Sequence, residues 1–184
     1  DPSWFLSSGH PNPQVASALQ ALASADAQGL NPADYDTTAL IEAFAQLAQA
    51  GSGVANETQR ESLNSRLTNS LVRYLHDVRD GRVDPHRVHE KFDVPAKPDF
   101  DARQYLNQAL QNNSLAEALH AARPRVPMYD AVVKAMAQYR TLARDPMWST
   151  PLPALPGRKL DPGGVYTAMP QRVQRLVALG DLPE

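Results

Sequence analysis

The side chains best suited to chemistry lie in a short stretch rich in histidine and carboxylate. His86 and His89 are three residues apart, Glu90 follows directly, and His76-Asp77 lies upstream. Two imidazoles at this spacing can share a zinc ion if the backbone between them is helical. Pro85 bounds the stretch, and the sequence indicates neither a third ligand nor the outer hydrogen bonds that orient ligands. Solvated loop histidines are the favoured interpretation, so we predict no metal site.

Paired carboxylates offer a second chemistry, that of a glycosidase with a helical fold. Glu57 with Glu61, and Asp77 with Asp80, have the spacing of neighbours on a helix. A general acid of this kind needs burial to raise its pKa, whereas these side chains fall on polar helix faces. A charged helix surface explains them. A zinc-dependent or carboxylate-dependent hydrolase stays the least favoured alternative, which metal analysis of the purified protein tests.

Two further patterns do not support a reaction centre. Ser7, Ser8 and His10 lack the strand, turn and helix that aim a serine nucleophile. Gly163-Gly164 lacks the spaced glycines, the lysine and the Ser or Thr of a phosphate loop, so a turn before Val165 is sufficient. We therefore predict no catalytic residue, no cofactor-binding residue and no cofactor.

Composition excludes several classes of protein. The 18 Lys and Arg residues nearly balance the 20 Asp and Glu residues, and the net charge of −2 does not favour nucleic acid as a partner. Cysteine is absent, which excludes thiolate catalysis and disulfides within these residues but leaves cytosol and periplasm open. No apolar run approaches the roughly 20 residues of a transmembrane helix. The start at Asp1-Pro2, without Met or a signal peptide, favours a piece of a longer protein.

Apolar residues recur at helical spacing along most of the chain, while no long alternation favours a sheet, so we predict a mainly α fold: an irregular multi-helix bundle with a Pro-rich connector and a C-terminal helix. Single bridges are conceivable at 81–83 or 165–166. The expected helices lie between Asn12-Pro13 and Gly29, between Asp36 and Gly51, between Asn56 and Gly81, and over 102–111, 115–122, 127–142 and 169–179.

Caps and breakers define the ends of these helices. Asn56 and Gln59 have the spacing of a capping box, and Ser114 and Glu117 that of a reciprocal cap. Asp84-Pro85 should prevent the helix before it from resuming, and Pro85, Pro95 and Pro98 predict a surface connector over 84–100. From Pro127, one further stripe should bury a clean helix face; its members are Tyr129, Val132, Val133, Met136, Tyr139 and Leu142.

A proline-rich segment suggests where domains meet. Residues 150–157 have the composition of a semi-rigid polyproline spacer. We expect a helical scaffold domain over 1–148, a linker over 149–159 and a truncated second module over 160–184.

The order of these motifs resembles a known family. Gly29 to Tyr35, Tyr74 to Pro85, Leu115 to Leu119 and Ala137 to Arg140 occur as in the N-terminal scaffold region of large multidomain L,D-transpeptidases of Gram-negative bacteria. Residues 160–183 are similar to the start of the peptidoglycan-binding module that follows there. The resemblance implies a periplasmic protein whose cysteine-dependent catalytic domain, a transferase that cross-links peptidoglycan stem peptides, lies further along the chain.

The resemblance thus predicts a non-catalytic scaffold fragment that supports peptidoglycan cross-linking and cell-wall remodelling. Its expected partners are the catalytic and peptidoglycan-binding domains of the same longer chain. In a variant, Arg172 and Arg175 meet stem-peptide carboxylates of peptidoglycan itself, but solvated helix arginines are the favoured interpretation, so we do not count them as a site. The alternative is a free-standing helical adaptor that binds a protein through Arg-rich faces and Trp4-Phe5. What the gene encodes after Glu184 separates the two.

Overall fold

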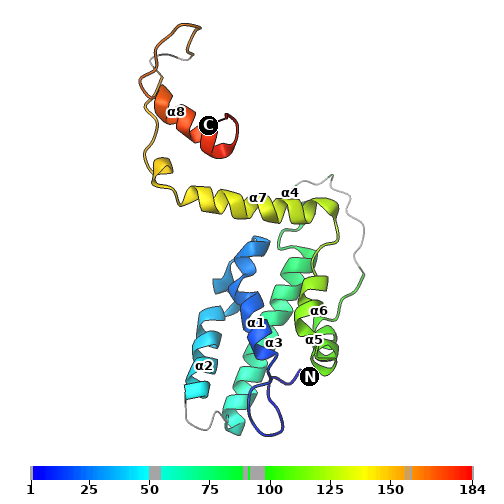
Figure 1. The fold of residues 1–184 in the computed structure, drawn as a ribbon. Coiled ribbons are helices and arrows are strands. Elements are labelled where there is room, and N and C mark those ends of the chain that lie inside the picture. Colours follow the sequence, from blue (N-terminus) through cyan, green and yellow to red (C-terminus); the bar gives the residue numbers. More distant parts are fainter. Residues whose placement is uncertain are drawn as a thin grey trace. The chain divides into compact units, whose positions relative to one another are not determined.

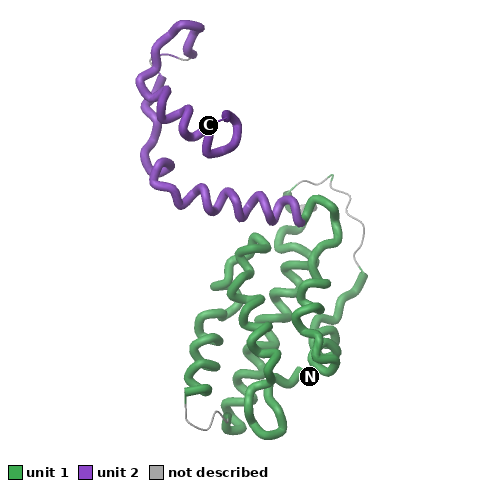
Figure 2. Tube along the Cα trace, viewed as in Figure 1, with its two compact units in different colours: residues 1–129 green, residues 130–184 purple. Residues whose placement is uncertain are grey.

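A computed structural model describes residues 2–49, 55–88, 91, 98–155, 157 and 159–183. The fold is mainly α-helical, as predicted (Figure 1). Within the described ranges no strand forms, and the isolated β-bridge pairs Phe5 with Pro11 rather than involving 81–83 or 165–166. The chain divides into two compact units, Asp1–Tyr129 and Asp130–Glu184 (Figure 2).

Unit 1 is an irregular helical bundle around one long central helix. α3 packs against α1, α2 and α5, while α1 also contacts α2 and α6. The elements of the unit are α1 (Val15–Ala23), the 3-10 helices η1 (Ala25–Gln28) and η2 (Pro32–Tyr35), α2 (Thr37–Gln49), α3 (Glu57–Asp80), α4 (Pro85–Val88), α5 (Ala102–Gln111) and α6 (Leu115–Ala121). The helices bury their apolar stripes in one shared core, in which α6 packs against α1 and α5.

The predicted signals for the central helix α3 are confirmed. The side chain of Asn56 accepts a hydrogen bond from the Gln59 amide at 2.9 Å, and the Gln59 side chain accepts one from the Asn56 amide at 3.0 Å. This capping box satisfies amides that a helix start leaves unpaired. An apolar stripe is buried along the helix from Leu63 onward; it consists of Leu63, Leu67, Leu71, Tyr74, Leu75 and Val78.

The helix ends between Gly29 and Tyr35 also follow local sequence signals. Gly29 closes η1 in the left-handed conformation, with φ 78° and ψ 11°. Asn31 then caps η2 by accepting a hydrogen bond from the Ala33 amide at 3.1 Å, and Pro32 takes the first helical position. The two 3-10 helices η1 and η2, each with a defined end, therefore connect α1 to α2.

The N-terminal segment is part of the core, which corrects its predicted role as a partner anchor. Trp4 is fully buried; its indole Nε1–H donates to Thr68 Oγ1 at 2.9 Å and its amide donates to Asn64 Oδ1 at 2.8 Å. Phe5 stacks on Phe44 with ring centroids 5.9 Å apart. Large aromatic side chains gain most by burial, so these two rings stabilise the bundle instead of meeting a partner.

The start of α6 is capped by a distant residue, contrary to the predicted reciprocal cap. Ser114 makes no side-chain cap hydrogen bond. The buried Gln14 side chain instead accepts from the Leu115 amide at 3.0 Å and donates to the Leu110 carbonyl at 3.0 Å. One amide group thus satisfies the end of α5 and the beginning of α6.

The chain after α3 differs from the prediction in one respect. Gly81 ends α3, as expected, but a short helix, α4, begins at Pro85. Proline fits the first position of a helix because its missing N–H has no partner there anyway. Of the predicted connector over 84–100, residues 89–90 and 92–97, which include Pro95, lie outside the described residues.

Unit 2 contains most of α7 (Pro127–Ala143), the 3-10 helix η3 (Pro146–Trp148) and α8 (Met169–Leu179). The predicted C-terminal helix and its Gly180 cap, with φ 80°, are confirmed. The predicted burial of the α7 stripe is wrong, because no residue of this fully described helix is buried. Val132 is 56% exposed and Tyr139 62%. Packing divides the chain inside α7, and the boundaries 1–148, 149–159 and 160–184 stay a prediction.

Candidate functional site

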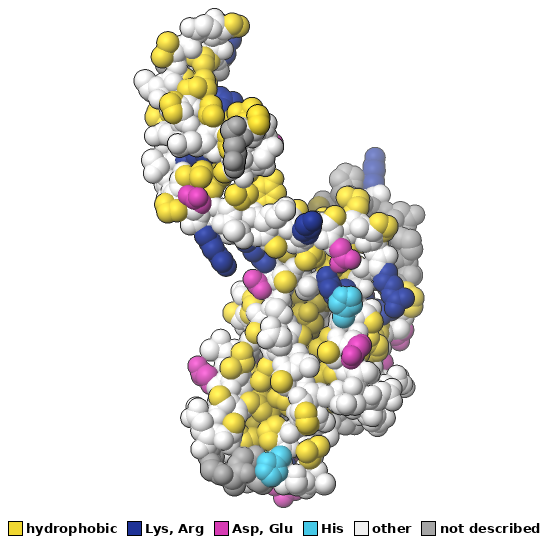
Figure 3. Space-filling view, viewed as in Figure 1, with side chains coloured by type: hydrophobic (Ala, Val, Ile, Leu, Met, Phe, Trp, Pro, Cys, Tyr) yellow, Lys and Arg dark blue, Asp and Glu magenta, His cyan; other side chains and the backbone are white. Residues whose placement is uncertain are grey.

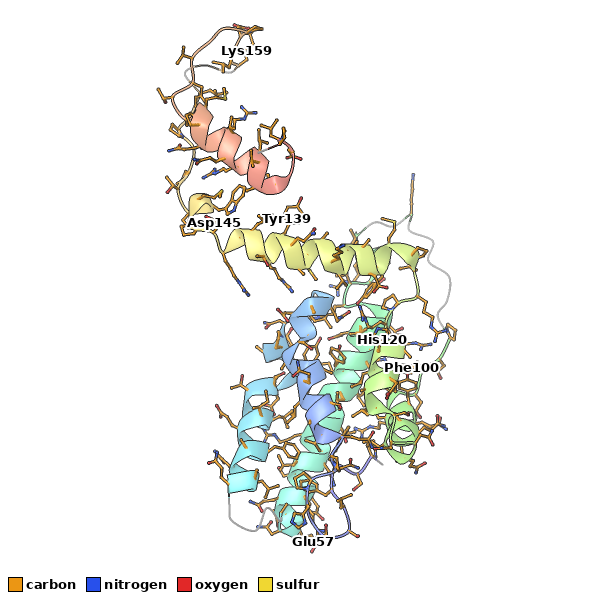
Figure 4. All side chains as sticks on the ribbon, in the orientation of Figure 1. Glu57, Phe100, His120, Tyr139, Asp145 and Lys159 are labelled. Atoms are coloured by element: carbon orange, nitrogen blue, oxygen red, sulfur yellow. The ribbon has the colours of Figure 1, made fainter. Side chains whose placement is uncertain are left out.

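The histidine cluster that the sequence singled out is only partly described. The side chain of His86 and the whole of His89 and Glu90 lie outside the described residues. His76 lies with its Nδ1 3.2 Å from Asp80 Oδ2 and its ring edge-on to that of Phe100, at 5.8 Å between centroids. Phe100 is labelled in Figure 4. In the described parts of the chain, no three His, Asp or Glu side chains gather as metal ligands would.

The carboxylate pairs are engaged with neighbouring groups. Asp77 accepts a hydrogen bond from the Tyr35 hydroxyl at 2.7 Å, and Asp80 lies beside His76. Glu57 and Glu61 line a shallow hollow of about 340 Å³ at the start of α3, together with Arg60. These surroundings are polar and open, unlike the apolar enclosure that holds a general acid protonated.

The N-terminal serines lie in an exposed turn. Ser8 Oγ and His10 Nδ1 are 3.2 Å apart, and the Gly9 amide donates to the Leu6 carbonyl at 2.9 Å. Ser7 lines the same hollow as Glu57. The turn is closed by the Phe5–Pro11 bridge, so its polar contacts are those of a local loop.

A polar network joins two of the sequence blocks that carry the family resemblance, Gly29–Tyr35 and Tyr74–Pro85. We call it the polar latch; it consists of Asp34 and Tyr35 in η2, Arg73 and Asp77 in α3, and Arg82 directly after Gly81. Arg82 Nη1 donates to Asp34 Oδ2 at 2.5 Å, and its Nε lies 3.8 Å from Asp77 Oδ2. Arg73 Nη1 donates to the Asp34 carbonyl at 3.0 Å. The contacts of Asp34 and Tyr35 thereby hold together residues that lie 39 to 48 positions apart in the chain.

Tyr35 is the buried member of the latch. Its side chain is 1% exposed, and its ring meets Tyr74 edge-on at 5.7 Å between centroids. Burial, followed by the hydrogen bond to Asp77 and the negative charge of that carboxylate, raises the pKa of Tyr35 well above its ordinary value. The phenol therefore stays a hydrogen-bond donor to Asp77 over the whole physiological range.

A separate ion pair lies beside the latch. Arg66 donates from Nε and Nη2 to Asp36 Oδ2, at 3.0 and 2.7 Å. Asp36 ends η2 with φ 54°, a left-handed conformation that aspartate tolerates better than most residues. This pair holds the start of α2 against α3, and both partners are partly exposed.

In unit 2 the arginine that was considered for stem-peptide carboxylates has partners of its own. Arg175 Nη2 donates to the Met147 carbonyl at 2.6 Å and to the Thr150 carbonyl, and its guanidinium lies 5.3 Å from the centroid of Trp148. Arg172 is exposed. An open groove of about 640 Å³ runs between α7 and the end of α8, lined in part by Lys134, Leu142 and Val177.

Comparison with protein families decides the classification. The Scaffold domain family matches residues 1–136 of the 184. The chain belongs to the Scaffold domain family. The match covers the whole bundle of unit 1 and the first half of α7, and the polar latch lies inside it. Neither the curated proteins nor the solved structures yield a match. Among the helices that the structure describes, none is long and apolar enough to cross a bilayer.

The sequence pointed to both halves of the latch but not to their meeting. Gly29–Tyr35 and Tyr74–Pro85 carry the family resemblance, and Asp77 has the spacing of a carboxylate pair with Asp80. Several acids and arginines flank each block, so the pairing of Arg82 with Asp34 has no signature in the linear order. The alternation of Asp and Arg over 77–84 was the available signal that this exit is tied down electrostatically.

Proposed function

We propose that this scaffold domain is the non-catalytic support of a periplasmic L,D-transpeptidase-like protein that takes part in peptidoglycan cross-linking and cell-wall remodelling. The observation that carries the proposal is the family match over 1–136, which includes three of the four motif blocks on which the scaffold resemblance rests. The fourth block, Ala137 to Arg140, directly follows the matched residues. A scaffold domain implies other domains that it supports. The partners we propose are the catalytic and peptidoglycan-binding domains of the same longer chain.

The close packing of unit 1 is consistent with a domain that acts as a rigid support for other domains. Its core runs continuously from Trp4 to Ala122, and α3 contacts most of the other helices. The latch adds polar ties at one end of α3, and Gln14 adds them between α5 and α6. A close-packed bundle of this kind has low compressibility and keeps its surfaces at fixed distances. Such a body can hold attached domains in register.

The side chains that were weighed for catalysis support the same proposal. Asp77 is bound to Tyr35, Asp80 lies against His76, and Arg175 is bound to backbone carbonyls. A group activated for acyl transfer needs a nucleophile, an orienting base and oxyanion donors arranged together. These side chains act as structural ties, and we propose that the reaction is carried out by a domain outside these residues.

The decisive test is the reaction itself. The purified chain is incubated with muropeptides that carry tetrapeptide stems, and the mixture is analysed by mass spectrometry for cross-linked dimers. We expect no product from this chain, and cross-linking by the full-length gene product with its cysteine domain. Dimers made by residues 1–184 alone would contradict the proposal. A reporter fusion of the full-length protein tests the proposed periplasmic location, which a cytoplasmic signal would refute.

The adaptor alternative has one observation in its favour. Apolar side chains reach the surface of unit 2 (Figure 3), among them Val132 and Tyr139 of α7, and an exposed apolar face can receive a protein partner. Against it, Trp4 and Phe5 are buried in the core and cannot serve as anchors. An in-frame stop directly after Glu184 in the gene would favour the adaptor, whereas a following domain with one cysteine and a histidine would favour the scaffold.

A further inference from the structure

The exit from α3 has the features of a hinge. Gly81 takes φ 78° and ψ 159°, a conformation that residues with a side chain rarely adopt. A Cβ at this position would meet nothing within 4 Å, so open space surrounds the backbone here. The Gly81 amide still donates to the Asp77 carbonyl at 3.1 Å, which completes the last turn of the helix. The direction of the following residues is therefore not dictated by close packing around Gly81.

Arg82 ties the chain directly after this hinge to the bundle. Its guanidinium reaches Asp34 in η2 and Asp77 in α3, so it joins two elements at once. Val83 and Val88, further along the segment, are 66% and 67% exposed and contribute little burial. The residues after Gly81 are thus held to the bundle by the electrostatic attraction of Arg82 to Asp34 and Asp77, whereas the other elements of unit 1 are held by apolar packing.

The ion pair of Arg82 and the apolar packing of α3 differ in their response to salt. The side chains of Arg82 and Asp34 are 49% and 34% exposed, so dissolved ions screen their attraction, over about 3 Å at 1 M salt. Leu71 and Leu75 of α3 are fully buried, and salt does not weaken hydrophobic burial in the same way. A rise in ionic strength therefore weakens the attachment of residues 82–88 at a salt concentration that leaves the packing of α3 intact.

We propose that the ion pair of Arg82 with Asp34 holds the chain at the Gly81 hinge: when salt screens this pair, or when an uncharged residue replaces Asp34, residues 82–88 detach from the bundle while α3 stays folded. The ion pair of Arg82 with Asp34 sets the direction in which the chain leaves α3, the longest helix. In a scaffold domain this direction determines where the following segment is presented. The inference concerns the bundle alone and does not depend on the transpeptidase proposal.

Trypsin provides a direct test because it cleaves after arginine, and an arginine side chain held in an ion pair is poorly available to it. Cleavage of the Arg82–Val83 bond in the whole chain is followed by mass spectrometry at low and high NaCl, normalised to a short peptide with the same sequence around Arg82. We expect Asp34→Asn to speed cleavage about fivefold at low salt. The wild-type rate should rise toward that of the variant at high salt, and the variant should respond little.

Asp36→Asn is the matched control. It removes the charge of a carboxylate two residues away that pairs with Arg66 and does not bind Arg82. Its cleavage after Arg82 should follow that of the wild type. An unchanged rate in Asp34→Asn, or an equal increase in Asp36→Asn, would overturn the proposal.

Hydrogen exchange decides the matter if Asp34→Asn proves globally unstable by circular dichroism. In Arg82→Gln the amides of residues 82–84 and 86–88 should exchange faster at low salt, while those of α3 between Leu67 and Leu75 keep their protection. Unchanged exchange over 82–88, or an equal loss of protection in α3, would show that Arg82 does not hold the exit separately from the helix.

Discussion

Units 1 and 2 carry similar apolar stripes but bury them to very different extents. In unit 1, α3 and α5 place their stripes in a continuous core. In unit 2, α7 and α8, both fully described, have no buried residue. The buried apolar side chains of that unit are Tyr166 and Ala168 among the residues that the structure describes. A stripe therefore predicts that a helix forms, but burial requires complementary elements around it.

The difference has a structural cause. α3 runs for 24 residues and is surrounded by α1, α2 and α5, which cover different sides of it. α7 and α8 face an open groove between them, and Val173 and Leu179 of α8 are 40% and 38% exposed. Each helix of unit 2 thus keeps part of its apolar face in water, which stabilises it less than full burial does.

The largest contrast is expected from shortening a leucine in each unit. Leu71→Ala removes a fully buried side chain of α3 and should lower the free energy of unfolding by about 3 kcal/mol, because it leaves a cavity in a close-packed core. Leu176→Ala in α8, where the side chain is half-buried, should cost less than about 1 kcal/mol. Urea unfolding followed by circular dichroism measures both. Equal losses would contradict the comparison.

A buried polar connection should be the next most costly loss. Gln14→Ala leaves the Leu110 carbonyl and the Leu115 amide without their partner, at a cost of about 2 kcal/mol for two buried backbone groups. Gln20→Ala, on the exposed face of α1, is the matched control and should stay within about 0.5 kcal/mol of the wild type. Thermal unfolding of the two variants side by side tests this, and similar melting temperatures would refute the capping role.

Tyr35 should link the stability of unit 1 to alkaline pH. Its pKa is raised in the folded state above the value near 10 of the unfolded chain. Its contribution is therefore complete below about pH 10 and is lost as the pH rises toward the folded-state pKa. Tyr35→Phe should cost about 1 kcal/mol at pH 7, where its hydrogen bond to Asp77 is missing.

The pH profile of Tyr35→Phe checks this linkage. Unfolding free energies measured from pH 8 to 11 should fall above pH 10 in the wild type and fall less steeply in the variant. Part of the decline should persist, because burial also raises the pKa of Tyr74. Parallel profiles for the two proteins would show that Tyr35 is not protected in the way its surroundings indicate.

The smallest effect is expected on the exposed face of α7. Tyr139→Ala should change the unfolding free energy by less than about 0.5 kcal/mol, since its side chain is 62% exposed. Tyr74→Ala, at 5% exposure in α3, is the counterpart in unit 1 and should cost several-fold more. A loss above about 2 kcal/mol for Tyr139→Ala in differential scanning calorimetry would mean that this face is covered in solution.

Much of the fold was predictable because its signals are local. The bounds Ala102–Gln111 of α5 and the capping box of Asn56 and Gln59 involve residues within about three helical turns of each other. Gly29, Gly81 and Gly180 end helices where the sequence placed them, since glycine adopts positive φ at little cost. Propensity, capping and breakers operate over a few residues and can be recognised in the linear order.

The tertiary structure decided what connects segments far apart in the chain. Gln14 caps α6 from a distance of 101 residues, and Arg82 meets Asp34 from 48 residues away. The burial of Trp4 beside Thr68, and the exposure of the α7 stripe, likewise depend on which elements surround these side chains. The amino-acid sequence by itself determined the helices and their ends through short-range hydrogen bonding and conformational preference. Which faces are buried and which charges pair was decided only by packing, because many partners are chemically equivalent until the chain is folded.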